Sequence, residues 1–159
     1  MRINRAVTVS DLRAYRAETL DFEGQWLEAI GRPELTGSWI VWGNSANGKT
    51  RFALQLAKYL AQFCRVAYNS LEEGLSATMR DAVLAIGMAD VQRSFVLLDK
   101  EPVNELYERL ARRKSPEVVI IDSLQYTGLS YSDYKKLRDR YRNKLFVWIS
   151  HAEGKDRKS

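Results

Sequence analysis

Residues 43–50 read Gly-Asn-Ser-Ala-Asn-Gly-Lys-Thr and directly follow the apolar run Trp39-Ile40-Val41-Trp42. This is the pattern G-x-x-x-x-G-K-[ST] at the exit of an expected strand, which is the context that the motif requires. The two glycines let the backbone curl, so that successive N–H groups can point at one anion. We therefore expect a phosphate-binding loop that consists of Gly43, Asn44, Ser45, Ala46, Asn47, Gly48, Lys49 and Thr50.

The last residues of this loop have distinct expected roles. Lys49 places a point charge beside the β- and γ-phosphates of a nucleotide, and Thr50 offers a hydroxyl to Mg²⁺. The helix expected from Lys49 to about Phe63 aims its positive end at the same phosphates. The loop thus predicts the binding of a nucleotide together with magnesium.

The composition limits the class of protein. The chain has 159 residues, 45% hydrophobic and 28% charged, which is typical of one soluble globular domain. It contains no apolar run near the ~20 residues that span a bilayer, so we expect no membrane partner. There is no apolar signal segment at the start and Cys64 is the lone cysteine, so the sequence predicts a cytoplasmic protein.

The positive charge is concentrated toward the C-terminus. The formal net charge is +5, and residues 135–159 hold nine Lys or Arg against three Asp or Glu. A basic segment of this kind favours a polyanionic partner such as nucleic acid. The alternative interpretation is a solvated helix face followed by a floppy tail.

Strand-like and helix-like stretches alternate from residue 38 onward. Apolar runs at 38–42, 66–70, 95–98, 118–121 and 145–149 predict strands, and apolar residues at helical spacing mark the segments between them. This alternation indicates an α/β fold, a three-layer α-β-α sandwich with a mainly parallel sheet. We expect its core at 36–152, a helical preamble at 1–35 that packs on the core, and a mobile basic tail at 153–159.

Three helices are expected in more detail. A capping box at Thr8-Val-Ser-Asp11 opens a helix through about Thr19, and helical spacing predicts a second one at 22–30. The helix after the phosphate loop is expected to bury one apolar face, formed by Phe52, Leu56, Tyr59, Leu60 and Phe63.

Ligands of a parallel sheet bind at the C-terminal ends of its strands, so the residues that follow the strands are candidates for the site. Asp122 closes a run of branched residues, an arrangement in which its carboxylate reaches Mg²⁺, usually through a water held with the Thr50 hydroxyl. Glu72, with Glu73 as runner-up, follows the second strand and could hold a water for attack on a γ-phosphate. His151, the only histidine, follows the fifth strand and could hydrogen-bond the same phosphate. The alternative is that these glutamates and the histidine are ordinary surface residues.

Together these stretches resemble the RecA superfamily of ATPases, in particular its branch with the RadA/Sms-type repair proteins and the DnaB-type replicative helicases. The matching stretches are residues 43–50, Ser70-Leu71-Glu72, Ile121-Asp122-Ser123-Leu124-Gln125, and Ser150-His151 followed by Gly154-Lys155. The resemblance covers about residues 36–155 and implies ATP hydrolysis with Mg²⁺, in which Glu72 polarises water and His151 senses the γ-phosphate. It also implies a homo-oligomeric ring or filament on DNA, with single-stranded DNA as the favoured partner.

Cores of this family continue with further strands beyond the fifth, whereas this sequence ends at Ser159. One expectation is therefore a truncated core that holds a nucleotide but is impaired in turnover. Two other functions stay open: a small-molecule or nucleotide kinase, and an ATP-binding assembly module without hydrolysis. The kinase is disfavoured because the candidate lid at 126–132 contains no arginine, and a GTPase because no Asn-Lys-x-Asp motif is present.

Overall fold

A computed structural model of the chain describes residues 5–15, 36–44, 47–123, 128 and 131–152. The chain divides into two units, Met1–Leu35 and Thr36–Ser159. In the first unit the described residues form one short helix, α1 (Val9–Ala14). Across the described part of the chain, no helix is long and apolar enough to cross a membrane.

Helix α1 begins as predicted but ends earlier. The Thr8 hydroxyl accepts a hydrogen bond from the Asp11 N–H at 3.1 Å, and the Asp11 carboxylate accepts one from the Thr8 N–H at 3.0 Å, which completes the capping box. The helix stops at Ala14 and Tyr15 is extended, so the predicted continuation is wrong at Tyr15. The second predicted helix, at 22–30, lies outside the described residues.

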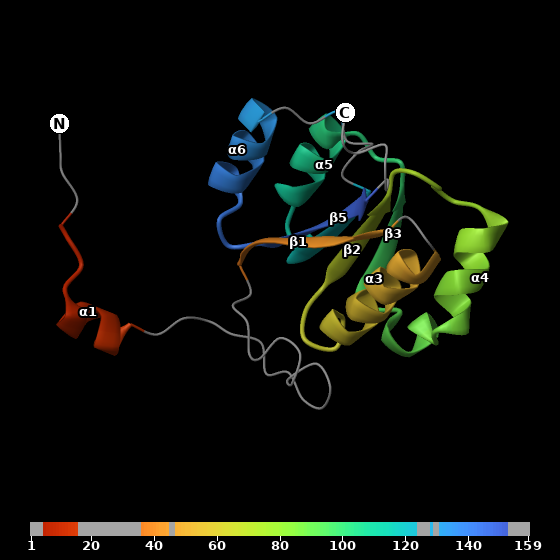
Figure 1. The fold of residues 1–159 in the computed structure, drawn as a ribbon, viewed down its shortest axis with the longest axis horizontal. Helices are drawn as coiled ribbons and strands as arrows, with labels where there is room; N and C mark the ends of the chain where they lie inside the picture. The colour runs from red at the N-terminus through yellow and green to blue at the C-terminus, as the bar shows by residue number, and fades with distance from the viewer. Residues whose placement is uncertain (1–4, 16–35, 45–46, 124–127, 129–130, 153–159) are drawn as a thin grey trace. The chain divides into compact units, whose positions relative to one another are not determined.

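The second unit is built on one sheet of five parallel strands (Figure 1). The strands are β1 (Gly37–Asn44), β2 (Val66–Ser70), β3 (Phe95–Asp99), β4 (Val118–Asp122) and β5 (Leu145–Ala152). Their order across the sheet is β1-β5-β4-β2-β3, and every pair of neighbours is parallel. The predicted α/β class with a parallel sheet is confirmed.

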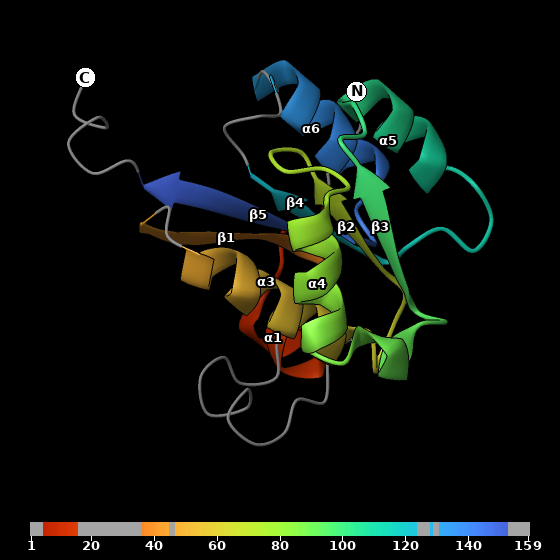
Figure 2. The same ribbon diagram turned by 90° about the vertical axis from the view of Figure 1, so that its right-hand side faces the viewer.

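Helices cover both faces of this sheet and complete the three layers (Figures 1 and 2). One face carries α3 (Asn47–Leu60) and α4 (Ala77–Ala85), and the other carries α5 (Val103–Leu110) and α6 (Tyr131–Arg140). A short 3₁₀ helix, η1 (Met88–Val91), lies between α4 and β3. Local signals set these bounds: the Ser76 hydroxyl caps α4 by accepting from the Met79 N–H, and Gly87, with a φ of 78°, follows its end.

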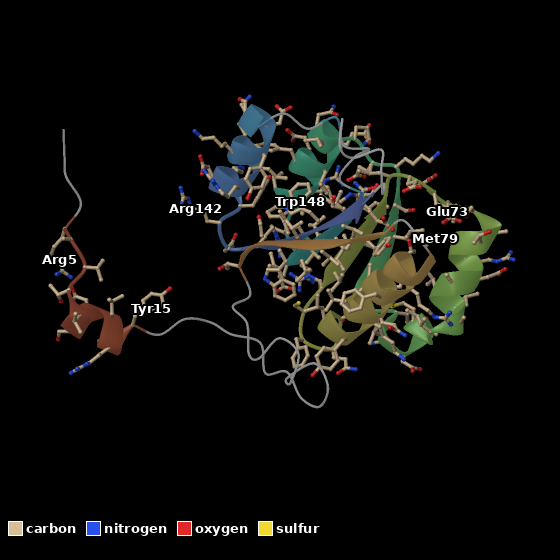
Figure 3. All side chains as sticks on the ribbon, viewed as in Figure 1. Arg5, Tyr15, Glu73, Met79, Arg142 and Trp148 are labelled. Atoms are coloured by element: carbon tan, nitrogen blue, oxygen red, sulfur yellow. The ribbon has the colours of Figure 1, made fainter. Side chains whose placement is uncertain are left out.

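Side chains alternate between the two faces along the buried strands. Ala67, Val119 and Ile121 belong to the apolar cluster that α5 and α6 cover. Trp148, which is labelled in Figure 3, lies in the same cluster. Its ring packs against Phe146 and Tyr134. The intervening positions of β2 and β4 therefore face α3, and this face carries the candidate site.

The expected buried face of α3 is correct in part. Leu56 and Leu60 are buried as expected, whereas Phe52 and Phe63 are 37% and 39% exposed, because α3 ends at Leu60 and Ala53 and Ala57 complete its buried stripe. In β1, Ile40 is 52% exposed. Within the described residues β1 lies at one end of the sheet, so it has a neighbouring strand on one side only.

Candidate functional site

The predicted phosphate loop joins β1 to α3 at the C-terminal edge of the sheet. Gly43 and Asn44 end β1, and Gly48, Lys49 and Thr50 belong to the first turn of α3. The register of β1 and β5 places Gly43 beside His151, so the backbone brings the loop and the predicted sensor position to one edge. Ser45 and Ala46 lie outside the described residues, and so do the side chains of Asn44, Asn47, Lys49 and His151.

The two predicted metal ligands, Thr50 and Asp122, are in contact. The Thr50 hydroxyl donates a hydrogen bond to the Asp122 carboxylate, with 3.3 Å between Oγ1 and Oδ2. Thr50 comes from α3, whereas Asp122 is the last residue of β4 and is 5% exposed. The helix and the strand thus place one hydroxyl and one buried carboxylate side by side.

This pair of oxygens fits magnesium by type and by spacing. Mg²⁺ prefers oxygen ligands, and two ligands at about 2.1 Å in adjacent octahedral positions lie about 3 Å apart. Among the described residues no group of three His, Cys, Asp or Glu could hold a metal by itself. A cation at this pair would therefore take its remaining ligands from water and from phosphate oxygens, as Mg²⁺ does in nucleotide sites.

Tyr68 is a site residue that the sequence analysis missed. It is fully buried in β2, and its hydroxyl donates a hydrogen bond to Oδ2 of Asp122 at 2.5 Å. In the register of β2 and β4, Tyr68 lies opposite Ile120, two residues before Asp122, so both side chains emerge on the face that α3 covers. Burial raises the pKa of Tyr68 well above its usual value, and the charge of Asp122 raises it further, so the phenol stays a neutral donor.

The two candidate glutamates after β2 are placed differently. The Ser123 hydroxyl lies 3.5 Å from Oε1 of Glu72, and the Glu72 N–H donates to the carbonyl of Asp122 at 3.2 Å. Glu73 instead accepts a hydrogen bond from the Ser76 hydroxyl at 2.8 Å, at the start of α4 (Figure 3). Glu72 is thus the glutamate beside the end of β4, whereas Glu73 belongs to the helix cap.

The opposite face of the sheet carries a separate polar cluster. The side-chain amide of Asn69 exchanges two hydrogen bonds with the backbone of Glu101, at 2.9 and 3.0 Å, and Arg109 holds the Glu101 carboxylate at 2.8 Å. These contacts tie the turn after β3 to β2 and α5. A cavity of about 1130 Å³ opens on this face between α5 and α6, and neither Thr50 nor Asp122 lines it.

Comparisons with known proteins support the fold. No protein-family model matches the chain, and no curated protein matches it by sequence. Among solved structures, the flagellar accessory protein FlaH from Methanocaldococcus jannaschii is similar at 15% identity with a TM-score of 0.63, over 86% of this chain and 71% of that chain. A second solved structure, described as an ATPase domain, is similar at 21% identity with a TM-score of 0.55, over 73% of this chain and 57% of that chain.

Both identities are low, so these similarities concern the fold, and this chain spans little more than half of the second structure. The fold of this chain that they support is a five-stranded parallel sheet with helices on its two faces. The strand order and the phosphate-loop pattern at the end of β1 agree with this fold. The chain therefore has a RecA-like P-loop fold.

Proposed function

We propose that this protein binds ATP with Mg²⁺ and hydrolyses it, and that it acts on or with DNA. The observation that carries the proposal is the contact between the Thr50 hydroxyl and the Asp122 carboxylate, at 3.3 Å. A buried carboxylate beside the hydroxyl that closes a phosphate loop is the pair of oxygens that a magnesium nucleotide uses. The similarity to a solved structure described as an ATPase domain favours the same chemistry.

Each residue of the site has a defined role in this proposal. The backbone N–H groups of residues 43–50 and the Lys49 ammonium hold the β- and γ-phosphates. Mg²⁺, held by Thr50 and Asp122, neutralises charge on the phosphates when it is bound. The Glu72 carboxylate accepts a hydrogen bond from the attacking water and orients it, while His151 donates to the γ-phosphate.

The finer assignment is the branch of the RecA superfamily that holds the RadA/Sms-type repair proteins and the DnaB-type helicases. It rests on the stretches Ser70-Leu71-Glu72 and Ile121-Asp122-Ser123-Leu124-Gln125. In this proposal the partner is single-stranded DNA and the chain assembles as a homo-oligomeric ring or filament. The basic segment from residue 135 onward supports an anionic partner, although Arg138 and Arg142 both contact Asp139 at 3.3 Å.

ATP turnover with and without single-stranded DNA separates this function from the two alternatives. Release of inorganic phosphate that rises with DNA is the expected result. Transfer of phosphate to a nucleoside or a sugar would identify a kinase instead, and tight ATP binding without any turnover would identify an assembly module. Lys49→Ala should lose the binding of both ATP and ADP, because the charge beside the phosphates is removed.

The role of Glu72 has a matched control in the next residue. Glu72→Gln should retain ATP binding and lose most of the turnover, because an amide cannot accept the proton of the attacking water. Glu73→Gln makes the same chemical change at the residue that caps α4 through Ser76, so its turnover should stay within a few-fold of the wild type. Equal turnover in the two variants would remove Glu72 from the mechanism.

A further inference from the structure

A basic pocket lies at the end of the sheet opposite to the candidate site. Its volume is about 230 Å³, and it opens where β2, β3 and β4 begin, whereas Asp122 lies where β4 ends. In Figure 2 the segment that leaves α5 passes beside the start of β3 at this end. Six cationic residues line the pocket: Arg65, Arg93, Arg109, Arg112, Arg113 and Lys114.

Two cations hold the loop that forms one wall of this pocket. The Arg65 guanidinium donates to the carbonyl oxygens of Lys114 and Ser115 at 3.1 and 3.2 Å. The Lys144 ammonium donates to the Ser115 hydroxyl at 2.8 Å and to the carbonyl of Pro116 at 2.7 Å. Arg65 and Lys144 thus fix the backbone of the loop after α5 through its carbonyl oxygens. The fixed backbone in turn positions the basic residues of this loop.

Most of the positive charge in the pocket has no acidic partner among the residues that the structure describes. Arg65 lies 3.9 Å from Glu117, and Arg109 lies 2.8 Å from Glu101. Within the described residues, no carboxylate lies within 4.0 Å of the four remaining cations, which are all exposed: Arg93, Arg112, Arg113 and Lys114. Four like charges around one hollow repel one another, and an anion bound between them would relieve this repulsion.

We propose that this pocket binds the phosphate backbone of double-stranded DNA. Arginine presents a planar fork of N–H donors that matches phosphate. The charges come from two segments of the chain, one before β3 and one after α5. The described lining has no aromatic side chain on which an unpaired base could stack, so contacts to the backbone of a duplex suit it better than contacts to a single strand.

This site goes beyond the proposed ATPase function, because it shares no residue with the phosphate loop and needs no nucleotide. The test therefore uses a short labelled DNA duplex without ATP, and fluorescence anisotropy measures its affinity as a function of salt. Four phosphate contacts predict a slope of about −3.6 for log K against log salt, which corresponds to about a 150-fold loss between 50 and 200 mM salt. The double variant Arg112→Ala, Arg113→Ala removes two of these contacts, so its slope should be about −1.8. Its affinity should then fall only about 12-fold between 50 and 200 mM salt.

Arg80→Glu is the matched control, because it changes the net charge by the same two units. Arg80 is exposed on α4 and does not line the pocket. The salt dependence of duplex binding by Arg80→Glu should therefore equal that of the wild type. An unchanged slope in the double variant, or an equal loss in Arg80→Glu, would overturn the proposal. Competition by polyglutamate as strong as by unlabelled duplex would do the same, since it would indicate an acidic protein partner.

The single variants Arg112→Ala and Arg113→Ala serve if the double variant unfolds, and each should reduce the slope by about 0.9. Thermal unfolding of every variant verifies that the fold is retained. If the duplex binds as expected while ATP turnover is absent, this inference stands and the proposed ATPase function fails, so the two failures can be told apart.

Discussion

Tyr68→Phe should weaken magnesium binding without opening a hole in the core. The substitution removes only the hydroxyl, which donates to Asp122 at 2.5 Å, and it leaves the buried ring in place. A hydrogen bond to a charged group contributes about 1.5–3 kcal/mol, and the loss leaves a carboxylate that is only 5% exposed with one donor fewer. We expect the free energy of unfolding to fall by about that amount.

The same hydroxyl sets the direction of the carboxylate toward Thr50. Partners that orient a metal ligand typically contribute about 10–100-fold in metal affinity. The concentration of Mg²⁺ that gives half-maximal ATP binding or turnover should therefore rise about 10–100-fold in Tyr68→Phe. Titration of Mg²⁺ at saturating ATP, with a fluorescent ATP analogue or with phosphate release, measures this shift.

Tyr141→Phe is the control for this prediction. Tyr141 is also a buried tyrosine, but its hydroxyl donates to the backbone carbonyl of Tyr107, in the cluster under α5 and α6. This variant should lose stability and keep the wild-type dependence on Mg²⁺. If both variants show the wild-type Mg²⁺ dependence, Tyr68 does not position the carboxylate and the reasoning is refuted.

Three further predictions concern stability. Arg109→Met should lower the free energy of unfolding by about 1–3 kcal/mol in chemical denaturation, because it leaves the buried Glu101 carboxylate without its cation, and equal stability would contradict this. Gly74→Ala should cost about 1–3 kcal/mol in the same assay, since Gly74 has a φ of 65° and an added Cβ would lie 2.6 Å from the Asp99 carboxylate. Burial raises the pKa of Cys64 from 9.0 to about 12, so its contribution to stability is present below pH 9 and is lost as the pH rises toward 12. Unfolding measured across that range should therefore show a steeper decline in the wild type than in Cys64→Ala.

The elements of the second unit could be predicted because their signals are local. The branched run before Asp122 predicts a buried strand, and Ser76 and Gly87 mark the two ends of α4 within one turn. The pairing of Thr50 with Asp122 could also be predicted, since Thr50 follows β1, Asp122 ends β4, and the C-terminal ends of parallel strands share one edge of the sheet.

The remaining features depend on which strands are neighbours. Tyr68 looks like an ordinary core aromatic until β2 is known to lie beside β4, and only then does its hydroxyl face Asp122. The exposure of Ile40 follows from the place of β1 at one end of the described sheet. The sequence favours Glu72 with Glu73 as runner-up, and the contact of Glu73 with Ser76 is visible only in the structure. Strand order arises from packing across the whole unit, which local patterns do not encode.

The position of β5 between β1 and β4 has a consequence for the order of folding. In the described residues β1 pairs only with β5, and Gly37 at its start lies opposite Leu145. The strand that leads into the phosphate loop therefore cannot join the sheet until the chain has been synthesised through β5, which ends at Ala152. Such long-range pairing is slow and leaves β1 exposed in the nascent chain, where an unpaired edge favours aggregation. The nascent chain should consequently gain affinity for nucleotide only after β5 has been synthesised and the sheet is complete.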